Sequence, residues 1–454
     1  MKPFALLLVV LIGASSCKKL VEPAQPSLGG TDLKKVLYLG GSWLSGMQNN
    51  VWDATSQNQA PCKLLYGQFA QAGAVDEFSA PELISLYGLG LGNPHHLYKS
   101  KTSVIVKQFA CDASSQFFIA EKNTSEAVLA KNYLAQHHVN GIYNALAFPY
   151  ATMASLTATN PAYSSTVPNP FYPYFASQPG VSTVLQDAQR INASFAVLQV
   201  GMDDIYNWAQ QGGSPMALPI PASAIFENKL ESLLQALQKA GMHNGVICTI
   251  PAISCLPYYS TLPPMGVQLD TAQAAQLNAL YGYSSILKFR SGKNGFVAES
   301  AVGTTTPSYS QPIKMLQENE SILLSVNADS LKCLGMGVFF PILDEYVLDE
   351  AELAKINQAI LSYNAIIKQK AADYNLAVAD WYSVMNEVKS GKVIDGLNFN
   401  TKFISGGFFS SDGQTPTAQG YAILTNEIIR AINLKFNATI APLAVTTFAG
   451  IQLP

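Results

Sequence analysis

The chain has 454 residues, of which 48% are hydrophobic and 13% are charged, and its formal net charge is −3 at pH 7. Such a composition indicates a well-packed globular protein and argues against an intrinsically disordered chain. The near-neutral charge, without a basic stripe, also argues against a nucleic-acid-binding surface.

The first residues have the pattern of an export signal. Lys2 precedes an apolar run over residues 4–12, and the small residues Gly13-Ala14-Ser15-Ser16 precede Cys17. The apolar run is shorter than the roughly 20 residues of a membrane-spanning helix. Small residues before a Cys resemble a bacterial lipobox, which implies cleavage before Cys17 and lipid attachment to its thiol. An ordinary secretory signal with a chance Cys is the alternative.

This pattern predicts where the protein resides. We expect residues 1–16 to be a lipoprotein signal peptide and residues 17–31, which are rich in Pro, Gly and polar residues, to be a flexible tether. Lipid chains on Cys17 would hold the protein at a membrane without a spanning helix. Lys18 rather than Asp follows the Cys, so we expect the outer membrane, on a face that the sequence does not specify.

Short apolar runs and amphipathic stretches alternate along the body. The runs predict buried strands at Val36–Leu39, Phe195–Gly201, Gly245–Pro251 and Leu376–Asp380. The amphipathic stretches predict helices at Phe226–Ala240, Leu348–Tyr374 and Ala418–Asn433. This alternation predicts an α/β fold, with a parallel sheet covered by helices on both faces. Ligand sites in such folds lie beyond the carboxyl ends of the strands.

Two long regions do not fit the alternation. We treat residues 51–135 and 252–345 as insertions into one domain that spans residues 32–440, followed by a tail at 441–454. The glycines of residues 87–92 do not sit between a strand and a helix with a following Lys, so they do not predict a phosphate site. Within the second insertion, residues 321–326 predict a strand.

Cysteines and histidines give no metal signature. Five cysteines follow Cys17, and an odd number leaves at least one unpaired. Cys248 and Cys255 lie close enough to form a disulfide, with buried free thiols as the alternative. The pairs His95-His96 and His137-His138 lack the spacing of ligands on one helix face. We expect no metal and no cofactor.

Four blocks carry residues that could form a serine hydrolase site. They are Gly40–Gly46 with Ser42, Asn144–Ala151 with Tyr150, Gly201–Asp204 with Asp203, and Phe409–Ala422 with Asp412 and Thr415. Together they resemble the SGNH/GDSL hydrolases, in particular the exported lipoprotein branch. The stretches Ile250–Tyr258 and Asp344–Asp349 are also similar to that branch. The resemblance implies a three-layer α/β/α, flavodoxin-like fold with large insertions.

The resemblance also implies roles for the four blocks. In this family the first block supplies a Ser nucleophile, and Ser42 stands at its position. The second and third supply a Gly N–H and an Asn side chain that stabilise the oxyanion. The fourth supplies an Asp and, three residues later, the His that activates the Ser. Here Asp412 is present, but Thr415 stands at the His position.

The blocks depart from the family pattern in ways that oppose catalysis. Gly41 replaces the usual Asp or Asn before the Ser, and Tyr150 stands where the Gly is expected. Asp203 replaces the Asn, and an ionised carboxylate has no donor for an oxyanion. Thr415 cannot act as a base near neutral pH, and loss of the base costs on the order of a million-fold in turnover in a serine protease.

We therefore expect a catalytically degenerate, membrane-anchored protein with a binding or accessory role in the cell envelope. Gly41, Trp43, Tyr150 and Asp203 would line the old crevice, where an apolar or acyl-bearing ligand would bind, and an outer-membrane protein is a further candidate partner. The alternative is a weak or specialised serine ester hydrolase that uses Ser42, with another His or a carboxylate such as Asp203 as its base.

Overall fold

The computed structural model describes residues 25–74, 77–81, 101–109, 115–123, 141–158, 169, 171–214, 218–282, 284, 287–306 and 309–451. Several residues singled out above lie outside this part of the chain: the predicted signal peptide, Cys17, Cys111, the glycines of residues 87–92 and the two His pairs.

A sheet of five parallel strands forms the centre of the main body. Across the sheet they are β4 (Ala145–Ala147), β1 (Val36–Gly40), β5 (Phe195–Gln199), β6 (Asn244–Cys248) and β13 (Leu376–Ala379). In chain order this is the 2-1-3-4-5 arrangement of flavodoxin-like folds. The predicted parallel sheet is confirmed. Strand β4 was not predicted, because three residues are too few to show a pattern.

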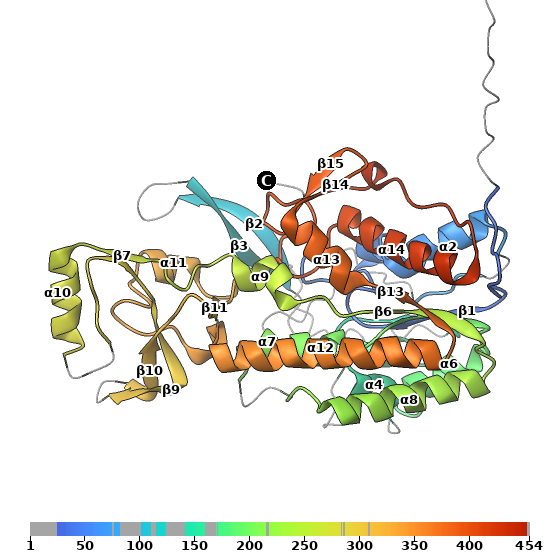
Figure 1. Cartoon of the computed structure of the whole chain (residues 1–454), viewed down its shortest axis with the longest axis horizontal. Helices are drawn as coiled ribbons and strands as arrows, with labels where there is room; N and C mark the ends of the chain where they lie inside the picture. The colour runs from blue at the N-terminus through green and yellow to red at the C-terminus, as the bar shows by residue number, and fades with distance from the viewer. Residues whose placement is uncertain are drawn as a thin grey trace, which may run out of the picture.

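Helices cover both faces of the sheet, as Figure 1 shows. One layer contains α4 (Met153–Thr157), α6 (Val184–Arg190), α7 (Met202–Ala209), α8 (Ser223–Lys239) and α12 (Glu350–Asp373). The other contains α2 (Pro61–Gln71), α13 (Trp381–Ser390) and α14 (Ala418–Phe436). Short helices α1 (Ala54–Asn58) and α5 (Tyr172–Phe175) and the strands β14 (Lys392–Ile394) and β15 (Leu397–Phe399) complete the body.

The three predicted helices are confirmed, with shifted ends. Helix α12 begins after Asp349, which forms a capping box with Glu352, so Leu348 belongs to the preceding strand instead. The cap satisfies backbone N–H groups that the first helical turn cannot pair. Helix α14 begins after Thr417, whose hydroxyl accepts from the N–H of Gly420 at 3.1 Å.

The second predicted insertion forms a separate lobe, which we define as residues 257–348. Its elements are α9 (Pro257–Ser260), β7 (Val267–Leu269), α10 (Thr271–Leu280), β8 (Gly292–Asn294), β9 (Val297–Thr306), β10 (Tyr309–Met315), β11 (Ser321–Ile322), α11 (Ala328–Lys332) and β12 (Val347–Leu348). The lobe has two hydrophobic clusters of its own and extends from one end of the main body (Figure 1). The strand predicted at 321–326 is confined to Ser321–Ile322.

The first predicted insertion begins later than residue 51. Its hairpin of β2 (Lys101–Phe109) and β3 (Ser115–Asn123) lies outside the parallel sheet. Helix α2, however, belongs to the main body: Leu65 and Phe69 are buried in its core, and the Phe69 ring lies 6.3 Å from that of Phe195. Apolar residues four apart on one helix face explain this packing.

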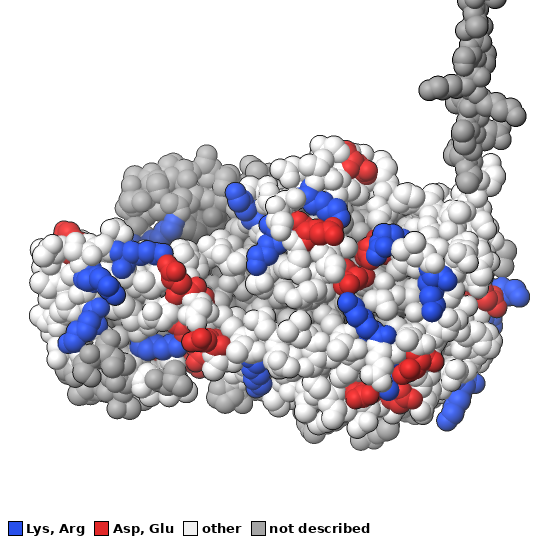
Figure 2. Space-filling view, viewed as in Figure 1, with Lys and Arg blue, Asp and Glu red and all other residues white. Residues whose placement is uncertain are grey.

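Both ends of the described chain pack against α14. The N–H of Gly30 donates to the carbonyl of Phe436 at 2.7 Å, so this part of the predicted tether packs on α14. In the tail, Leu443 donates to the Asn426 side chain at 2.7 Å, and Val445 is buried. Charged side chains of both signs are spread over the face of the molecule in Figure 2.

The cysteine alternatives are settled within the described part of the chain. Cys62, Cys248 and Cys255 are buried free thiols, so the pairing of Cys248 with Cys255 is wrong. Cys333 is disulfide-bonded. Burial raises the pKa of Cys62 to about 12 and raises that of Cys248 well above its usual value. These thiols therefore remain protonated and inert near neutral pH.

Candidate functional site

Ser42 lies in the tight turn that follows β1, at the carboxyl edge of the sheet. The turn is anchored to the neighbouring strand, because the N–H of Gly41 donates to the side chain of Gln199 at 3.0 Å. Ser45 donates its hydroxyl to the carbonyl of Ser42 at 2.9 Å, which closes the turn. Only 6% of Ser42 is exposed. The predicted position of Ser42 at the end of the first strand is confirmed, but its hydroxyl is buried.

Asp203 is the partner of Ser42. It stands in the first turn of α7, which starts directly after the left-handed Gly201 at the end of β5. The Ser42 hydroxyl donates to Asp203 Oδ1 at 2.5 Å, and the Ser42 backbone N–H donates to Asp203 Oδ2 at 3.1 Å. One carboxylate therefore accepts from both donors of the residue at the nucleophile position.

This contact depends on a glycine at position 41. A Cβ atom on Gly41 would lie 1.7 Å from Asp203 Oδ2, far inside the contact distance of two non-bonded heavy atoms. Asp203 therefore fills the space that a side chain at position 41 would occupy. Two departures from the family pattern, Gly41 and Asp203, are coupled sterically.

Burial alters the acidity of two neighbouring carboxyl groups. Burial raises the pKa of Asp203 to about 7, although its hydrogen bonds from Ser42 oppose the rise. Burial also raises the pKa of Asp204 to about 6. The hydrogen bond that the Met153 N–H donates to Asp204 at 2.8 Å opposes this rise. At neutral pH a substantial fraction of the molecules therefore carries a protonated, uncharged Asp203. Only the molecules with an ionised Asp203 would repel an oxyanion.

Tyr150 keeps the backbone conformation of a glycine. Its φ is +58°, a left-handed value that costs a residue with a side chain about 1 kcal/mol or more. In this conformation its N–H donates to Ser42 Oγ at 2.9 Å. Its hydroxyl donates to Asn50 at 3.0 Å, and its ring stacks on Phe171. The predicted oxyanion donor is thus present, but it is paired with the serine itself.

Among the described residues, Asp412 accepts four hydrogen bonds, none of them from a histidine. Its Oδ1 accepts from the N–H groups of Gln414 and Thr415, each at 2.7 Å. Its Oδ2 accepts from the Thr415 hydroxyl at 2.5 Å and from the N–H of Asn50 at 2.7 Å. The Asp of the fourth block therefore holds a local turn together, and Thr415 completes that turn.

The turn Gln48–Val51 joins these blocks, and its role was not predicted. Asn49 and Asn50 both have positive φ, at 54° and 61°. Asn49 accepts from Ser411, while Asn50 accepts from Tyr150 and donates to Asp412. Two consecutive Asn residues are a turn signal, because Asn tolerates the left-handed region. That signal predicts the turn from sequence, although not its contacts.

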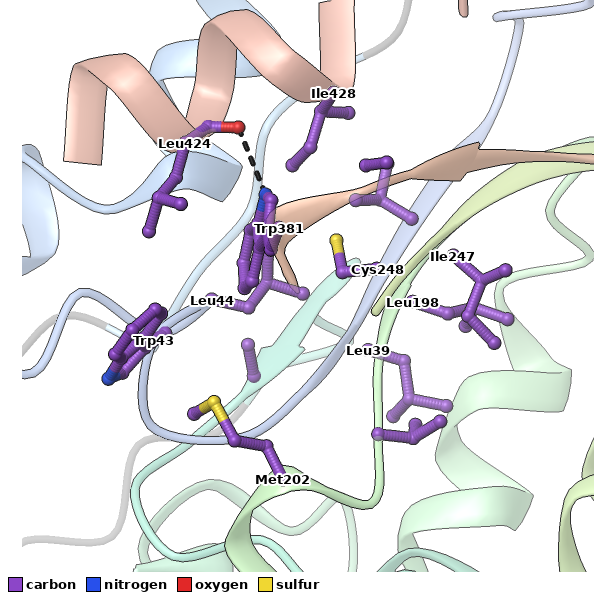
Figure 3. Close-up of a cluster of buried hydrophobic side chains, with 14 of the residues drawn as sticks. Leu39, Trp43, Leu44, Leu198, Met202, Ile247, Cys248, Trp381, Leu424 and Ile428 are labelled. Carbon is purple, nitrogen blue, oxygen red and sulfur yellow. Dashed lines mark hydrogen bonds between the residues drawn. The ribbon is translucent and has the colours of Figure 1, made fainter. Parts of the chain in front are cut away.

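Trp43 does not line the site, so that prediction is wrong. It is 1% exposed and packs in the core beside Trp381, with ring centroids 5.9 Å apart (Figure 3). Phe409 and Tyr206 contact it edge-on. The residue after Ser42 points to the opposite side of the turn, and a large apolar ring there gains more from the core than from a polar site.

Apart from Asp203, no candidate base is placed beside Ser42 in the described part of the chain. His243 precedes β6 and donates its N–H to Ser194, at the opposite end of the strands from Ser42. Within the described ranges, no group of three His, Cys, Asp or Glu side chains is arranged to hold a metal ion. Over the same residues, no helix is both long and apolar enough to cross a bilayer.

Comparison with known families gives a match over most of the body. The model of the GDSL-like lipase/acylhydrolase family matches residues 150–428, more than half of the chain. The match includes Tyr150, Asp203, Asp412 and Thr415, and it begins after Ser42. Among curated proteins, none matches the chain significantly.

Proposed function

The chain belongs to the GDSL-like lipase/acylhydrolase family, and from that premise we propose that it is a non-hydrolytic member acting as a lipid-anchored binding or accessory protein of the cell envelope. Its catalytic residues have become a closed hydrogen-bond network. The lobe of residues 257–348, rather than the crevice, is the recognition surface in this proposal. Its partner would be an apolar or acyl-bearing ligand, or an outer-membrane protein.

The observation that carries this proposal is the pairing of the two backbone donors expected at the oxyanion. The Ser42 N–H donates to Asp203, and the Tyr150 N–H donates to Ser42 Oγ. A reacting ester needs both donors aimed at its carbonyl oxygen, in a site free of competing acceptors. Here Asp203 already accepts at that position, so a substrate would have to displace a buried carboxyl group.

The base side of the site supports the same conclusion. A serine hydroxyl is a weak nucleophile until a base removes its proton. Thr415 has no basic group, and Asp412 is fully engaged in the turn that includes Thr415 and Asn50. The oxyanion donors and the residues at the base position are therefore all engaged in hydrogen bonds that hold the fold together.

The proposed anchor rests on the sequence around Cys17. Small residues precede this Cys, and a short apolar run precedes them. Lipid on Cys17 would place the protein at a membrane surface without a spanning helix. The lobe exposes apolar side chains, including Phe339 at 61% and Leu334 at 66%, which supports a recognition role there.

The test of the lost activity is ester hydrolysis by the purified protein. Rates on p-nitrophenyl acetate and butyrate would be compared with those of Ser42→Ala and of Ser45→Ala, a buried serine in the same turn. We expect all three rates to equal the background. A rate that Ser42→Ala abolishes and Ser45→Ala preserves would overturn the proposal.

One observation favours a second candidate, a serine ester hydrolase with Asp203 as its base. The 2.5 Å hydrogen bond from Ser42 and the pKa of about 7 give Asp203 the position and basicity of a general base. This candidate requires hydrolysis that rises as pH increases through about 7. It also requires that Ser42→Ala and Asp203→Asn each abolish the activity.

A further inference from the structure

The N-terminal segment leaves the body at a fixed point. Residues 25–31 lie along the end of α14: Gly30 donates to Phe436 at 2.7 Å, and Thr439 donates to Ser27 at 2.9 Å. Gly29 has a φ of +56°, and a Cβ there would lie 2.4 Å from the Phe436 carbonyl. Residues 27–30 are therefore held tightly against the end of α14.

This point lies at the end of the sheet opposite Ser42. Phe436 packs against Phe195, the first residue of β5, with ring centroids 6.0 Å apart. Strands β1 and β6 begin beside it, since Lys35 accepts from Ser194 and Ser194 accepts from His243. We call this end of the molecule, where β1, β5 and β6 begin and α14 ends, the basal pole. Ser42 and Asp203 follow the opposite ends of β1 and β5.

The lobe is also remote from the basal pole. Helix α12 connects the two, because it begins directly after the lobe and ends just before β13. Its 24 residues span about 36 Å. A chain of eight residues, the number in residues 17–24, reaches at most ~26–29 Å when fully extended. In Figure 1 the N-terminal segment and the lobe lie at opposite ends of the long axis.

The basal pole carries exposed positive charge. Its exposed basic side chains are Lys34, Lys35, Lys239 and Lys435. Asp32 and Asp373 are acidic residues at the same pole, and Arg190, shortly before Ser194, is paired with Asp187. Leu434, next to Lys435 at the end of α14, is 69% exposed. Figure 2 shows basic side chains, with acidic ones among them, at the end of the body from which the N-terminal segment departs.

We propose that the basal pole is the membrane-facing surface of the protein, and that its lysines contact the phosphate headgroups of the bilayer. The Ser42 edge and the lobe then point away from the membrane. This inference rests on the proposed anchor at Cys17. A short tether at this pole brings it to the membrane surface, and the lysines favour this end over the sides of the body, since cationic side chains are attracted to anionic lipid surfaces.

The test measures which end of the anchored protein meets the bilayer. The full-length lipidated protein would be placed in phosphatidylcholine vesicles that contain phosphatidylglycerol and a headgroup nitroxide lipid. A fluorophore would be attached to Leu434→Cys or, as the matched variant on the lobe, to Phe339→Cys; both sites are exposed, whereas the free native thiols within the described residues are buried. We expect several-fold stronger quenching at position 434 than at position 339.

Flotation of the vesicles distinguishes failure of the proposed anchor from failure of the proposed orientation. Protein that does not float with the vesicles would overturn the anchor, and this inference with it. Protein that floats but shows equal quenching at the two positions, or stronger quenching at 339, would overturn the orientation alone. The double variant Lys34→Glu/Lys35→Glu should float normally and lose quenching at 434; unchanged quenching would overturn the role of the lysines.

Discussion

The Asp203 carboxyl group fills the space that a side chain at Gly41 would need: a Cβ on Gly41 would lie 1.7 Å from Asp203 Oδ2. The family pattern places Asp or Asn at position 41 and Asn at position 203. The Asp203 carboxyl group, placed where it accepts from Ser42, leaves no room for the usual Asp or Asn at position 41. The two changes therefore form one rearrangement of the site.

The first prediction concerns this pair. Gly41→Ala should lower the free energy of unfolding by about 1–3 kcal/mol, because the added methyl overlaps a buried carboxyl group. Gly67→Ala is the matched control, since a Cβ there meets nothing within 4 Å on helix α2. It should be neutral or stabilise by roughly 0.5–1 kcal/mol. Urea unfolding of both variants measures the difference.

A double-mutant cycle tests the coupling itself. In the Asp203→Ala background, Gly41→Ala should cost less than it does in the native protein, because the overlapping carboxyl group is gone. An equal cost in both backgrounds would show that the two positions are independent, and it would contradict the single rearrangement.

A second prediction concerns pH. Burial raises the pKa of Asp203 to about 7, that of Asp204 to about 6 and that of Glu352 to about 7. Between about pH 4 and pH 7 the folded protein therefore binds more protons than the unfolded chain does. The free energy of unfolding must then fall as pH rises through this window. We expect a higher Tm at pH 5 than at pH 8.

Two variants test whether the pH dependence of Tm comes from Asp203. Asp203→Asn should flatten the slope of Tm between pH 5 and pH 8, because the Asn side chain does not titrate. Glu231→Gln should leave the slope unchanged, since hydrogen bonds from Tyr374 and Lys370 lower the pKa of Glu231 to about 2 and keep it ionised throughout. A slope in Asp203→Asn equal to that of the native protein would contradict the assignment.

A third prediction separates a structural Asp412 from a catalytic one. Asp412→Ala removes the acceptor of the backbone N–H groups of Asn50, Gln414 and Thr415. The free energy of unfolding should drop by roughly 3 kcal/mol, because these donors lose a charged partner. Asp412→Asn keeps one acceptor oxygen and should cost less. Equal stability of the two variants and the native protein would rule out the structural role.

The sequence predicts the fold more fully than the site. Apolar runs indicate four of the five sheet strands, because buried parallel strands are continuously apolar. The positions of Ser42 and Asp203 at one edge also follow, since parallel strands end together. The direction in which each side chain points does not follow. Trp43 turns into the core beside Trp381, and nothing in the local pattern distinguishes the two faces of that turn (Figure 3).

Contacts between segments far apart in the chain could not be predicted from the sequence either. The Asn49–Asn50 turn joins Tyr150 to Asp412 across 100 and 362 residues of chain. Hydrogen bonds over such separations depend on the assembled fold, whereas turn signals report only local backbone preference. Likewise, the substitution of Asn by Asp203 predicts a lost donor, but not a carboxyl group whose pKa burial raises to about 7.

The fourth prediction tests the proposed loss of hydrolytic activity. Thr415→His supplies a base beside Asp412, and Asp203→Asn removes the carboxyl group that accepts from Ser42 and supplies an amide donor. The double variant should hydrolyse p-nitrophenyl acetate above background, and Ser42→Ala in the same background should abolish the rate. Thr415→His alone should be at least ~100-fold slower, because one oxyanion donor is worth roughly that factor. If Thr415→His alone matches the double variant, Asp203 does not obstruct the oxyanion position, and the base is the single missing part.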